Sequence, residues 1–312
     1  MSITVRPYQG PEDFDRVGDF LIRYYQPGNR DGNWFQSTWE YMHSHPMLDE
    51  SSLGKIGIWE DAGQIVGVAH YESTLGEAFF ELHPEYTHLK SEMIEYAEGH
   101  LCGKTENGRT YLKAFVNDFD AEFTDIARSR GYEHDADNDR PMSQFIIPAP
   151  FPAITLPTGF QLKSLQDDNN LYQMHRVLWR GFNHPGEPSE DGVEGRKKMQ
   201  SVPNFNKDLK IVAIAPDGNF VSFCGMWYDA VNRISYVEPV ATDPDYRRVG
   251  LGKAAVWEGI RRCGALGATV AFVGSEQPFY QAIGFTKVFT SRCWKKSIST
   301  LKLDATRQAP SC

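Results

Sequence analysis

The apolar residues of this 312-residue chain follow a helical spacing in some segments and a strand pattern in others. The order of these helical and strand segments in the first half occurs again in the second half. Residues 12–25 place apolar side chains three and four positions apart, as on one face of a helix, whereas runs such as 65–69 are short and rich in β-branched residues. The first half is therefore predicted to contain, in order, a strand, a helix, a hairpin, a strand, a helix, a strand and a helix, over residues 3–9, 12–25, 56–69, 77–82, 86–101, 110–115 and 123–129.

The second half repeats this order. Pro84 and Pro244 are 160 residues apart, the hairpin glycines Gly63 and Gly218 are 155 apart, and Gly131 and Gly284, near the end of each half, are 153 apart. Such near-constant spacing indicates an internal duplication. The matching strand, helix, hairpin, strand, helix and strand are predicted over residues 160–165, 171–179, 211–227, 234–240, 253–262 and 269–273.

A proline-rich stretch separates the halves. Three prolines fall within residues 147–152, and proline-rich segments are stiff and extended. We therefore predict two domains, residues 1–146 and 153–312, joined by the linker 147–152. Strands that alternate with helices and also form hairpins favour an α/β fold with a mixed sheet in each domain.

The composition narrows the classes of function. With 41% hydrophobic and 23% charged residues, it is that of a soluble globular protein. No apolar run has the length of a signal-peptide core or a membrane span, so we predict neither a leader nor a membrane partner. Five scattered cysteines without a C-x-x-C pair predict reduced thiols in the cytoplasm, and no histidine spacing predicts a metal site. The net charge of −9 argues against a nucleic-acid partner.

Residues 233–252, RISYVEPVATDPDYRRVGLG, carry the clearest chemistry. A predicted strand leads through a proline-containing turn into a basic loop with two glycines, and a predicted helix follows the loop. The N-terminus of a helix offers unpaired backbone N–H groups and the positive end of a dipole. Glycines there let a phosphate approach closely, so the pattern predicts a diphosphate-binding site.

One interpretation of this site is a dinucleotide. Gly250-x-Gly252-x-x-Ala255 matches the G-x-G-x-x-G/A pattern, which would make the protein a nucleotide-dependent oxidoreductase binding NAD. In that fold, however, the strand runs directly into the first glycine. Here residues 243–248 intervene, and too little chain follows to complete a doubly wound sheet.

The other interpretation rests on a family likeness. The loop RRVGLG at 247–252 resembles the acyl-CoA pyrophosphate loop, R/Q-x-x-G-x-G/A, of the GNAT N-acetyltransferase superfamily. Residues 237–240 and 268–273 resemble that family's fourth and fifth strands, and YQAIGF at 280–285 resembles its closing Y-x-x-x-G-F signature. The resemblance covers about residues 158–298 and implies two tandem GNAT-like acyl-CoA N-acyltransferase domains.

This resemblance implies acetyl-CoA as the cofactor. Its diphosphate would bind the backbone amides of the loop, and its pantetheine arm would bind the strand after Pro239, where the fourth and fifth strands part. A proline in a strand supports such a parting because it lacks the N–H group of a ladder hydrogen bond. The implied cofactor-binding residues are Val240, Ala241, Thr242, Arg247, Arg248, Val249, Gly250, Leu251, Gly252 and Lys253.

Transfer of an acyl group to an amine needs one group that removes a proton from the amine and another that protonates the leaving thiolate. The resemblance implies that Glu238 is the base, acting directly or through a water molecule, and that Tyr280 is the general acid. A phenol with a pKa near 10 keeps its proton at neutral pH. The alternatives are a solvent-facing strand glutamate and a tyrosine that only packs.

The acceptor site is predicted from position. Trp227, Tyr228 and Asp229 end the strand before the central motif, and Phe182 and His184 follow the first helix of the second half. By the resemblance, both segments face the acceptor cleft. Aromatic rings beside a carboxylate suit an amine, partly through cation–π contacts.

The first half lacks the phosphate-binding pattern. Its matching residues, 87–92, read THLKSE, so both glycines are absent and Glu92 adds a carboxylate. Side chains there would crowd a diphosphate and the charge would repel it. We therefore predict that the first half keeps the fold and has lost the cofactor.

Together with these residues, the resemblance implies an acetyl-CoA-dependent N-acetyltransferase. It would transfer acetyl to a primary amine of a small molecule by direct attack in a ternary complex, since no cysteine beside the motif suggests a covalent intermediate. A non-catalytic acyl-CoA-binding or regulatory module is the alternative. The sequence does not choose among an aminoglycoside-like antibiotic, a polyamine, an amino-acid metabolite or a protein N-terminus as acceptor, and it leaves a homodimer open.

Overall fold

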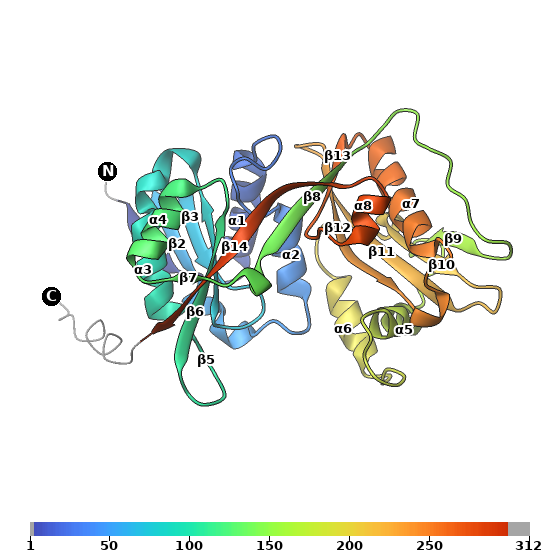
Figure 1. Cartoon of the computed structure of the whole chain (residues 1–312), viewed down its shortest axis with the longest axis horizontal. Coiled ribbons are helices and arrows are strands. Elements are labelled where there is room, and N and C mark those ends of the chain that lie inside the picture. The colour runs from blue at the N-terminus through green and yellow to red at the C-terminus, as the bar shows by residue number, and fades with distance from the viewer. Residues whose placement is uncertain (1–2, 299–312) are drawn as a thin grey trace. The chain divides into compact units, whose positions relative to one another are not determined.

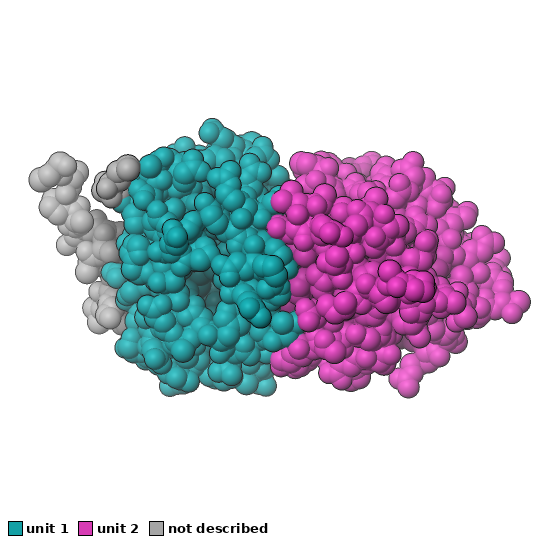
Figure 2. All heavy atoms as spheres, turned by 90° about the horizontal axis from the view of Figure 1, so that it is seen from above, with its two compact units in different colours: residues 1–43, 47–141, 288–312 teal, residues 44–46, 142–287 magenta. Residues whose placement is uncertain are grey.

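A computed structural model describes residues 3–298 of the chain. Its contacts divide these residues into two compact units, coloured in Figure 2. Unit 1 contains residues 3–43, 47–141 and 288–298, and unit 2 contains residues 44–46 and 142–287. Each unit is a mixed β-sheet packed with helices, which confirms the predicted α/β class (Figure 1).

The sheet of unit 1 has the strand order β1-β2-β3-β4-β6-β14, with β5 beside β6 and β7 beside β14. The pair β4–β6 is parallel. The elements along the first half of the chain are β1 (Thr4–Pro7), α1 (Pro11–Tyr24), α2 (Gln36–Ser44), β2 (Gly57–Asp61), β3 (Gln64–His70), β4 (Glu77–Leu82), α3 (Lys90–His100), β5 (Gly103–Lys104), β6 (Thr110–Asn117), α4 (Ala121–Ser129), β7 (Glu133–His134) and β8 (Arg140–Ile146), with 3₁₀ helices η1 (Glu50–Lys55), η2 (Pro84–Leu89) and η3 (Ala136–Asn138).

The sheet of unit 2 has the order β8-β13-β12-β11-β10-β9, in which β12–β13 is the parallel pair. The elements of the second half are β9 (Gln161–Ser164), α5 (Leu171–Gly181), α6 (Gly192–Met199), β10 (Lys210–Ile214), β11 (Phe220–Asp229), β12 (Ile234–Thr242), α7 (Leu251–Ala265), β13 (Val270–Val273), α8 (Pro278–Ala282) and β14 (Thr286–Ile298), with η4 (Lys207–Leu209) and η5 (Pro244–Tyr246).

Each unit takes its last strand from the other half of the sequence. Strand β8 ends the first half but pairs with β13 in unit 2, for example Phe145 with Ala271. Strand β14 ends the second half but pairs with β6 in unit 1, for example Cys293 with Phe115. The compact units therefore differ from the contiguous stretches 1–146 and 153–312.

Helix α7 connects the two parallel strands of unit 2 and lies close against the sheet. Its buried side includes Ala254, Ala255 and Gly259. A Cβ atom on Gly259 would lie 2.5 Å from Cγ of Met226 on β11, so the close approach depends on a glycine. In a parallel β-α-β connection the helix begins after the carboxyl end of the first strand. This arrangement places the N-terminus of α7 beside the end of β12.

The described helices and cysteines test two of the predictions from composition. Over residues 3–298, no helix combines the length and the apolar character that a membrane span requires. Four cysteines are free thiols, namely Cys102, Cys224, Cys263 and Cys293. Cys312, the fifth cysteine of the sequence, lies outside the described residues.

Candidate functional site

Strands β12 and β13 part in the middle of the unit 2 sheet. They pair in parallel from Ile234–Val270 to Tyr236–Phe272, and β12 then continues alone on that side to Thr242. The carboxyl ends of parallel strands are where α/β proteins commonly bind ligands. The parting therefore opens a binding site beside the second half of β12.

A β-bulge accompanies the parting. The register between β11 and β12 shifts between Cys224 and Met226, so that Gly225 faces the Glu238–Pro239 pair. A Cβ atom on Gly225 would lie 2.3 Å from the carbonyl oxygen of Glu238, so a glycine is required there. Bulges re-aim side chains, and the half-buried Glu238 lines the space between the separated strands.

That space is a cavity of about 850 Å³, called here the large cavity. Its volume lies within the roughly 300–1,000 Å³ typical of small-molecule sites. Four segments line it: residues 181–183, the end of β12, the loop and helix start at 246–253, and residues 273–283. Glu238 and Tyr280, the two predicted catalytic residues, both belong to its wall. In residues 3–298, no group of three or more His, Cys, Asp or Glu side chains is placed to hold a metal ion.

Residues 247–253, called here the cofactor loop, form the basic end of the large cavity. Gly250 is the N-cap of α7 with φ of 92°, a left-handed conformation that favours glycine. No side chain caps α7, and its first turn contains no acidic residue. A Cβ atom on Gly252 would lie 3.1 Å from Oγ1 of Thr242, so the loop lies tightly against β12. An uncapped helix N-terminus with close backbone access fits a diphosphate.

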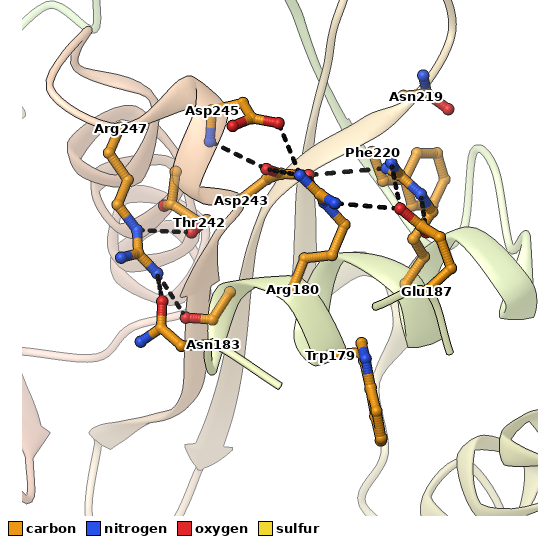
Figure 3. A network of polar contacts seen from close by, with 12 residues as sticks. Trp179, Arg180, Asn183, Glu187, Asn219, Phe220, Thr242, Asp243, Asp245 and Arg247 are labelled. Carbon is orange, nitrogen blue, oxygen red and sulfur yellow. Dashed lines mark hydrogen bonds and ion pairs between the residues drawn. The ribbon is translucent and has the colours of Figure 1, made fainter. Parts of the chain in front are cut away.

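Arg247 uses its guanidinium group within the protein (Figure 3). Its Nε donates a hydrogen bond to the carbonyl oxygen of Thr242 at 3.0 Å. Its Nη2 donates to the carbonyl oxygen of Gly181 at 2.8 Å and to Oδ1 of Asn183 at 3.0 Å. Arg247 thus ties the end of β12 to the segment 181–183. Its side chain has partners other than the phosphate that the sequence led us to expect.

We expect Arg247→Lys and Arg247→Met to weaken acetyl-CoA binding equally, by about tenfold, because each removes the guanidinium fork that holds the cavity wall. Lysine keeps the charge, so it should show no advantage if Arg247 acts through these bonds. The check is the Kd for acetyl-CoA of both variants by titration calorimetry. Wild-type affinity in Arg247→Lys, with loss only in Arg247→Met, would instead show that Arg247 binds the diphosphate as a charge.

A second ion-pair network supports the same end of β12 (Figure 3). Asp243 is 1% exposed and accepts hydrogen bonds from Nε of Arg180 at 2.6 Å and from Nη2 at 3.1 Å. Arg180 also reaches Asp245 at 2.7 Å and Glu187 at 3.0 Å. Burial opposes ionisation of Asp243, but the bonds from Arg180 outweigh burial and hold the pKa of Asp243 below its usual value. The network joins α5 to the turn that precedes the cofactor loop.

Tyr280 lies on α8 with 9% of its surface exposed. Its ring packs edge-on against Phe279 and Phe285, with centroids 5.0 and 5.6 Å away. Burial raises the pKa of Tyr280, and the nearby Cys224 and Glu238 raise it further. The phenol therefore keeps its proton throughout the neutral range, as a general acid must.

Replacement of Tyr280 by Phe should keep the ring packing and remove only the hydroxyl. We expect kcat to fall by about 100-fold, the lower end of general-acid contributions, with the Kd for acetyl-CoA unchanged. Because its pKa is raised, Tyr280 should cause no alkaline loss of kcat below about pH 10 in the wild type. Steady-state kinetics against pH check both points, with Tyr172→Phe on α5 as a matched control. Unchanged kcat in Tyr280→Phe would assign the proton to another donor.

The structure brings together only part of the predicted acceptor site. Phe182 is 52% exposed and lines the large cavity, but His184 instead stacks on Trp179 with centroids 4.4 Å apart. Trp227 is 2% exposed, and its indole N–H donates to the carbonyl oxygen of Glu238 at 3.0 Å. Trp227 therefore supports the bulge from inside the sheet.

Tyr228 and Asp229 have local partners at the far end of β11. The Tyr228 hydroxyl donates to the carbonyl oxygen of Leu266 at 2.7 Å. The Asp229 carboxylate accepts hydrogen bonds from the backbone of Val231 and Asn232 and closes the β11–β12 turn. Neither residue is among the described residues that line the large cavity.

Unit 1 contains a smaller counterpart of this site. Its parallel pair β4–β6 joins only Glu77–Lys113 and Ala78–Ala114, and a cavity of about 450 Å³ lies beyond. In it, Nζ of Lys90, in the first turn of α3, lies 2.9 Å from carboxylate oxygens of Asp120 and Glu122. The ammonium group of Lys90 at the start of α3 is therefore paired with two carboxylates of the protein itself.

Glu92 is placed differently from our expectation. Its carboxylate accepts a hydrogen bond from the indole N–H of Trp59 at 2.8 Å, and Glu92 is not among the described residues lining the unit 1 cavity. Glu92 lies in the first turn of α3, and its side chain is directed to Trp59 on β2. The ion pairs of Lys90, rather than Glu92, distinguish this cavity from the large cavity of unit 2.

The sequence reasoning missed several residues of the large cavity. Phe279 and Gln277 line it from the start of α8, and Ser275 lines it from the preceding loop. Their position just before Tyr280 was a usable signal. Arg180 gave no such signal, because its partners Asp243 and Asp245 are more than 60 residues away in the sequence.

The second half of the chain is similar to a known protein family. Residues 171–289 match the model of the acetyltransferase (GNAT) family. The match confirms, for this part of the chain, the resemblance to that family that the sequence motifs indicated. Comparison with curated proteins gives no match.

Solved structures support a tandem GNAT fold for both units. A GCN5-related N-acetyltransferase from Sphaerobacter thermophilus is similar over 95% of each chain, at 16% identity and a TM-score of 0.63. A tandem GNAT protein from the clavulanic acid biosynthesis pathway is similar over 95% of this chain and 98% of its own, at 12% identity and a TM-score of 0.62. Saccharomyces cerevisiae N-myristoyltransferase, solved with myristoyl-CoA, is similar over 95% of this chain and 79% of its own, at 12% identity and a TM-score of 0.54.

Proposed function

We propose that the second half of the chain binds acetyl-CoA and transfers its acetyl group to a primary amine of a small molecule by direct attack in a ternary complex. One observation carries the proposal: the large cavity has the cofactor loop at one end and both Glu238 and Tyr280 in its wall. An anion site joined to a base and an acid is what acyl transfer from a thioester requires.

The residues divide the work as follows. When bound, acetyl-CoA supplies an activated acetyl group as a thioester. The backbone amides from Val249 to Lys253 hold its diphosphate. Backbone groups of Val240 and Thr242 on β12, beyond the point where β13 separates from it, hold the pantetheine arm. Glu238 accepts the proton that the attacking amine must lose, directly or through a water molecule. Tyr280 donates a proton to the sulfur that leaves.

The acceptor binds at the part of the large cavity that Phe182 lines. Phe182 offers an exposed aromatic face beside the large cavity, which suits a cationic or aliphatic amine. We also propose a reducing, cytoplasmic setting, supported by the four free thiols of the described chain.

The experiment that tests this function measures release of free thiol from acetyl-CoA with a panel of amines. The panel contains polyamines, aminoglycosides, amino-acid metabolites and a short peptide with a free N-terminus. We expect amine-dependent thiol release for at least one small-molecule class. Tight acetyl-CoA binding without amine-dependent release from any class would favour the non-catalytic acyl-CoA-binding module.

A further inference from the structure

A short piece of the chain bridges the place in unit 1 where β4 and β6 part. Residues 32–34, called here the bridging segment, lie between α1 and α2 and belong to no helix or strand. Asn117, the last residue of β6, donates from Nδ2 to the carbonyl oxygen of Gly32 at 2.8 Å. The N–H of Trp34 donates to Oε2 of Glu81 on β4 at 2.6 Å. The bridging segment is therefore bonded to both of the parted strands.

Asn33, in the middle of the bridging segment, pairs with the backbone of β4. Its Nδ2 donates to the carbonyl oxygen of Leu82 at 3.2 Å, and its Oδ1 accepts from the N–H of Leu82 at 2.7 Å. Asn33 is 2% exposed. A neighbouring strand exchanges the same two bonds with a residue that faces it. One side-chain amide thus satisfies both backbone groups of Leu82, which would be costly to leave unpaired in a buried place.

Leu82 is the counterpart of a residue in the large cavity. Leu82 and Thr242 each stand two residues before the matching prolines, Pro84 and Pro244. In both units the next residue donates its N–H to the preceding strand at 2.9 Å. Because the N–H direction alternates along a strand, the N–H groups of Leu82 and Thr242 point to the side where the strands part. Asn33 thus places an amide where the proposed function places the amides of the pantetheine arm in unit 2.

The bridging segment fits closely between the parted strands. Gly32 has φ of 78°, and a Cβ atom on it would lie 2.4 Å from Nδ2 of Asn117, so a side chain there would displace the bond to β6. The ring of Trp34 packs against Phe79 on β4, with centroids 4.7 Å apart. Phe115 on β6 belongs to the same apolar cluster. The unit 1 cavity is the space that remains beside this segment.

We propose that the parting between β4 and β6 is an amide-binding site and that the carboxamide of Asn33 occupies it. The chemical class of its ligand is a primary or secondary amide, which accepts from the N–H of Leu82 and donates to its carbonyl oxygen. While Asn33 is in place, an amide from outside, such as the pantetheine arm of an acyl-CoA, meets an N–H that is already bonded. The site gives unit 1 a second reason, beside the ion pairs of Lys90, to bind no cofactor, and only this last step rests on the proposed function.

The test removes the internal amide and supplies a free one. Asn33→Gly takes away the equivalent of one acetamide molecule, and hydrogen exchange followed by mass spectrometry reports on the amide of Leu82. We expect that amide to exchange about tenfold faster in Asn33→Gly, as the loss of one hydrogen bond allows. Adding about 100 mM acetamide should restore most of the protection by mass action and leave the wild type unchanged. Acetate has the same shape but no N–H to donate, so it should restore none.

Two further variants complete the test. Asn107→Gly removes the same side chain from an exposed turn of unit 1 and should show neither effect. Asn33→Asp keeps the size of the side chain and its acceptor but has no donor for the carbonyl oxygen of Leu82. We expect Asn33→Asp to have a lower Tm than the wild type, and this expectation holds even if Asn33→Gly does not fold.

The outcomes separate this inference from the proposed function. Wild-type exchange at Leu82 in Asn33→Gly, a wild-type Tm in Asn33→Asp, or an equal effect of acetamide on Asn33→Gly and Asn107→Gly would overturn the amide site. None of these measurements uses acetyl-CoA. Failure of the wild type to bind acetyl-CoA would overturn the proposed function and leave the site at Asn33 standing.

Discussion

Glu238→Gln is expected to lower kcat/KM by about 10²–10⁴-fold, the range for loss of a general base, while the Kd for acetyl-CoA stays the same. The amide keeps the size and the hydrogen-bonding shape of the carboxylate but cannot accept the amine proton. Because the bulge is fixed by Gly225 and by the backbone of Glu238, the strand geometry should persist. Steady-state kinetics give kcat/KM, and titration with acetyl-CoA gives the Kd.

Glu276→Gln is the matched control for that variant. It removes the same charge from an exposed residue of the loop after β13, outside the described lining of the large cavity. We expect wild-type kinetics from this control. If Glu238→Gln retained full kcat/KM, the carboxylate would be a structural feature of β12 and the proton would go to water or to another group.

The second large effect concerns Gly250. We expect Gly250→Asp to weaken acetyl-CoA binding by about 100-fold, since a unit charge about 5 Å from the diphosphate costs ~3 kcal/mol at an effective dielectric constant of about 20. Gly250→Asn should lose far less, because asparagine has the same shape without charge and tolerates the left-handed conformation seen here, φ 92°. Titration calorimetry of the pair separates charge from strain.

Equal, large losses in both variants would mean that the backbone conformation at Gly250 matters and the charge does not. Wild-type affinity in Gly250→Asp would place the diphosphate away from the start of α7, and the cofactor assignment would then fail.

The sequence was most informative where the chemistry is local. The cofactor loop, Glu238 and Tyr280 lie in short motifs, and a proline on the strand indicated the parting of β12 from β13 that the structure contains. Such motifs need only the geometry of one loop or one bulge. They could therefore be found from neighbouring residues alone.

The direction in which a side chain points, and its partners far away in the sequence, could not be predicted from neighbouring residues. Tyr228 lies beside Trp227 in sequence, but its hydroxyl bonds to Leu266 at the end of α7, whereas Trp227 supports the bulge. Arg247 bonds to Gly181 and Asn183, 66 and 64 residues away. Which way a side chain points depends on these contacts, and the motif does not contain them.

The pattern of apolar residues also could not predict that β8 pairs in unit 2 and β14 in unit 1. Strand β14 carries ordinary strand residues, but its partner β6 lies more than 170 residues earlier in the sequence.

Helix α6 was missed for a different reason. Its eight residues include two glycines, and only Met199 is buried, so no helical period marks it.

The measurement that tests the central claim most directly is the stoichiometry of acetyl-CoA binding to the whole chain, by titration calorimetry of the wild type and Gly250→Asp. We expect one acetyl-CoA per wild-type chain and no measurable binding to Gly250→Asp at the same concentration. The reason is that the start of α7 in unit 2 has the glycines of the cofactor loop, whereas the matching residues 87–92 before and within α3 of unit 1 contain no glycine. Two sites per chain would contradict the loss of the cofactor from unit 1. Binding of NAD with no binding of acetyl-CoA would contradict the acetyltransferase assignment altogether.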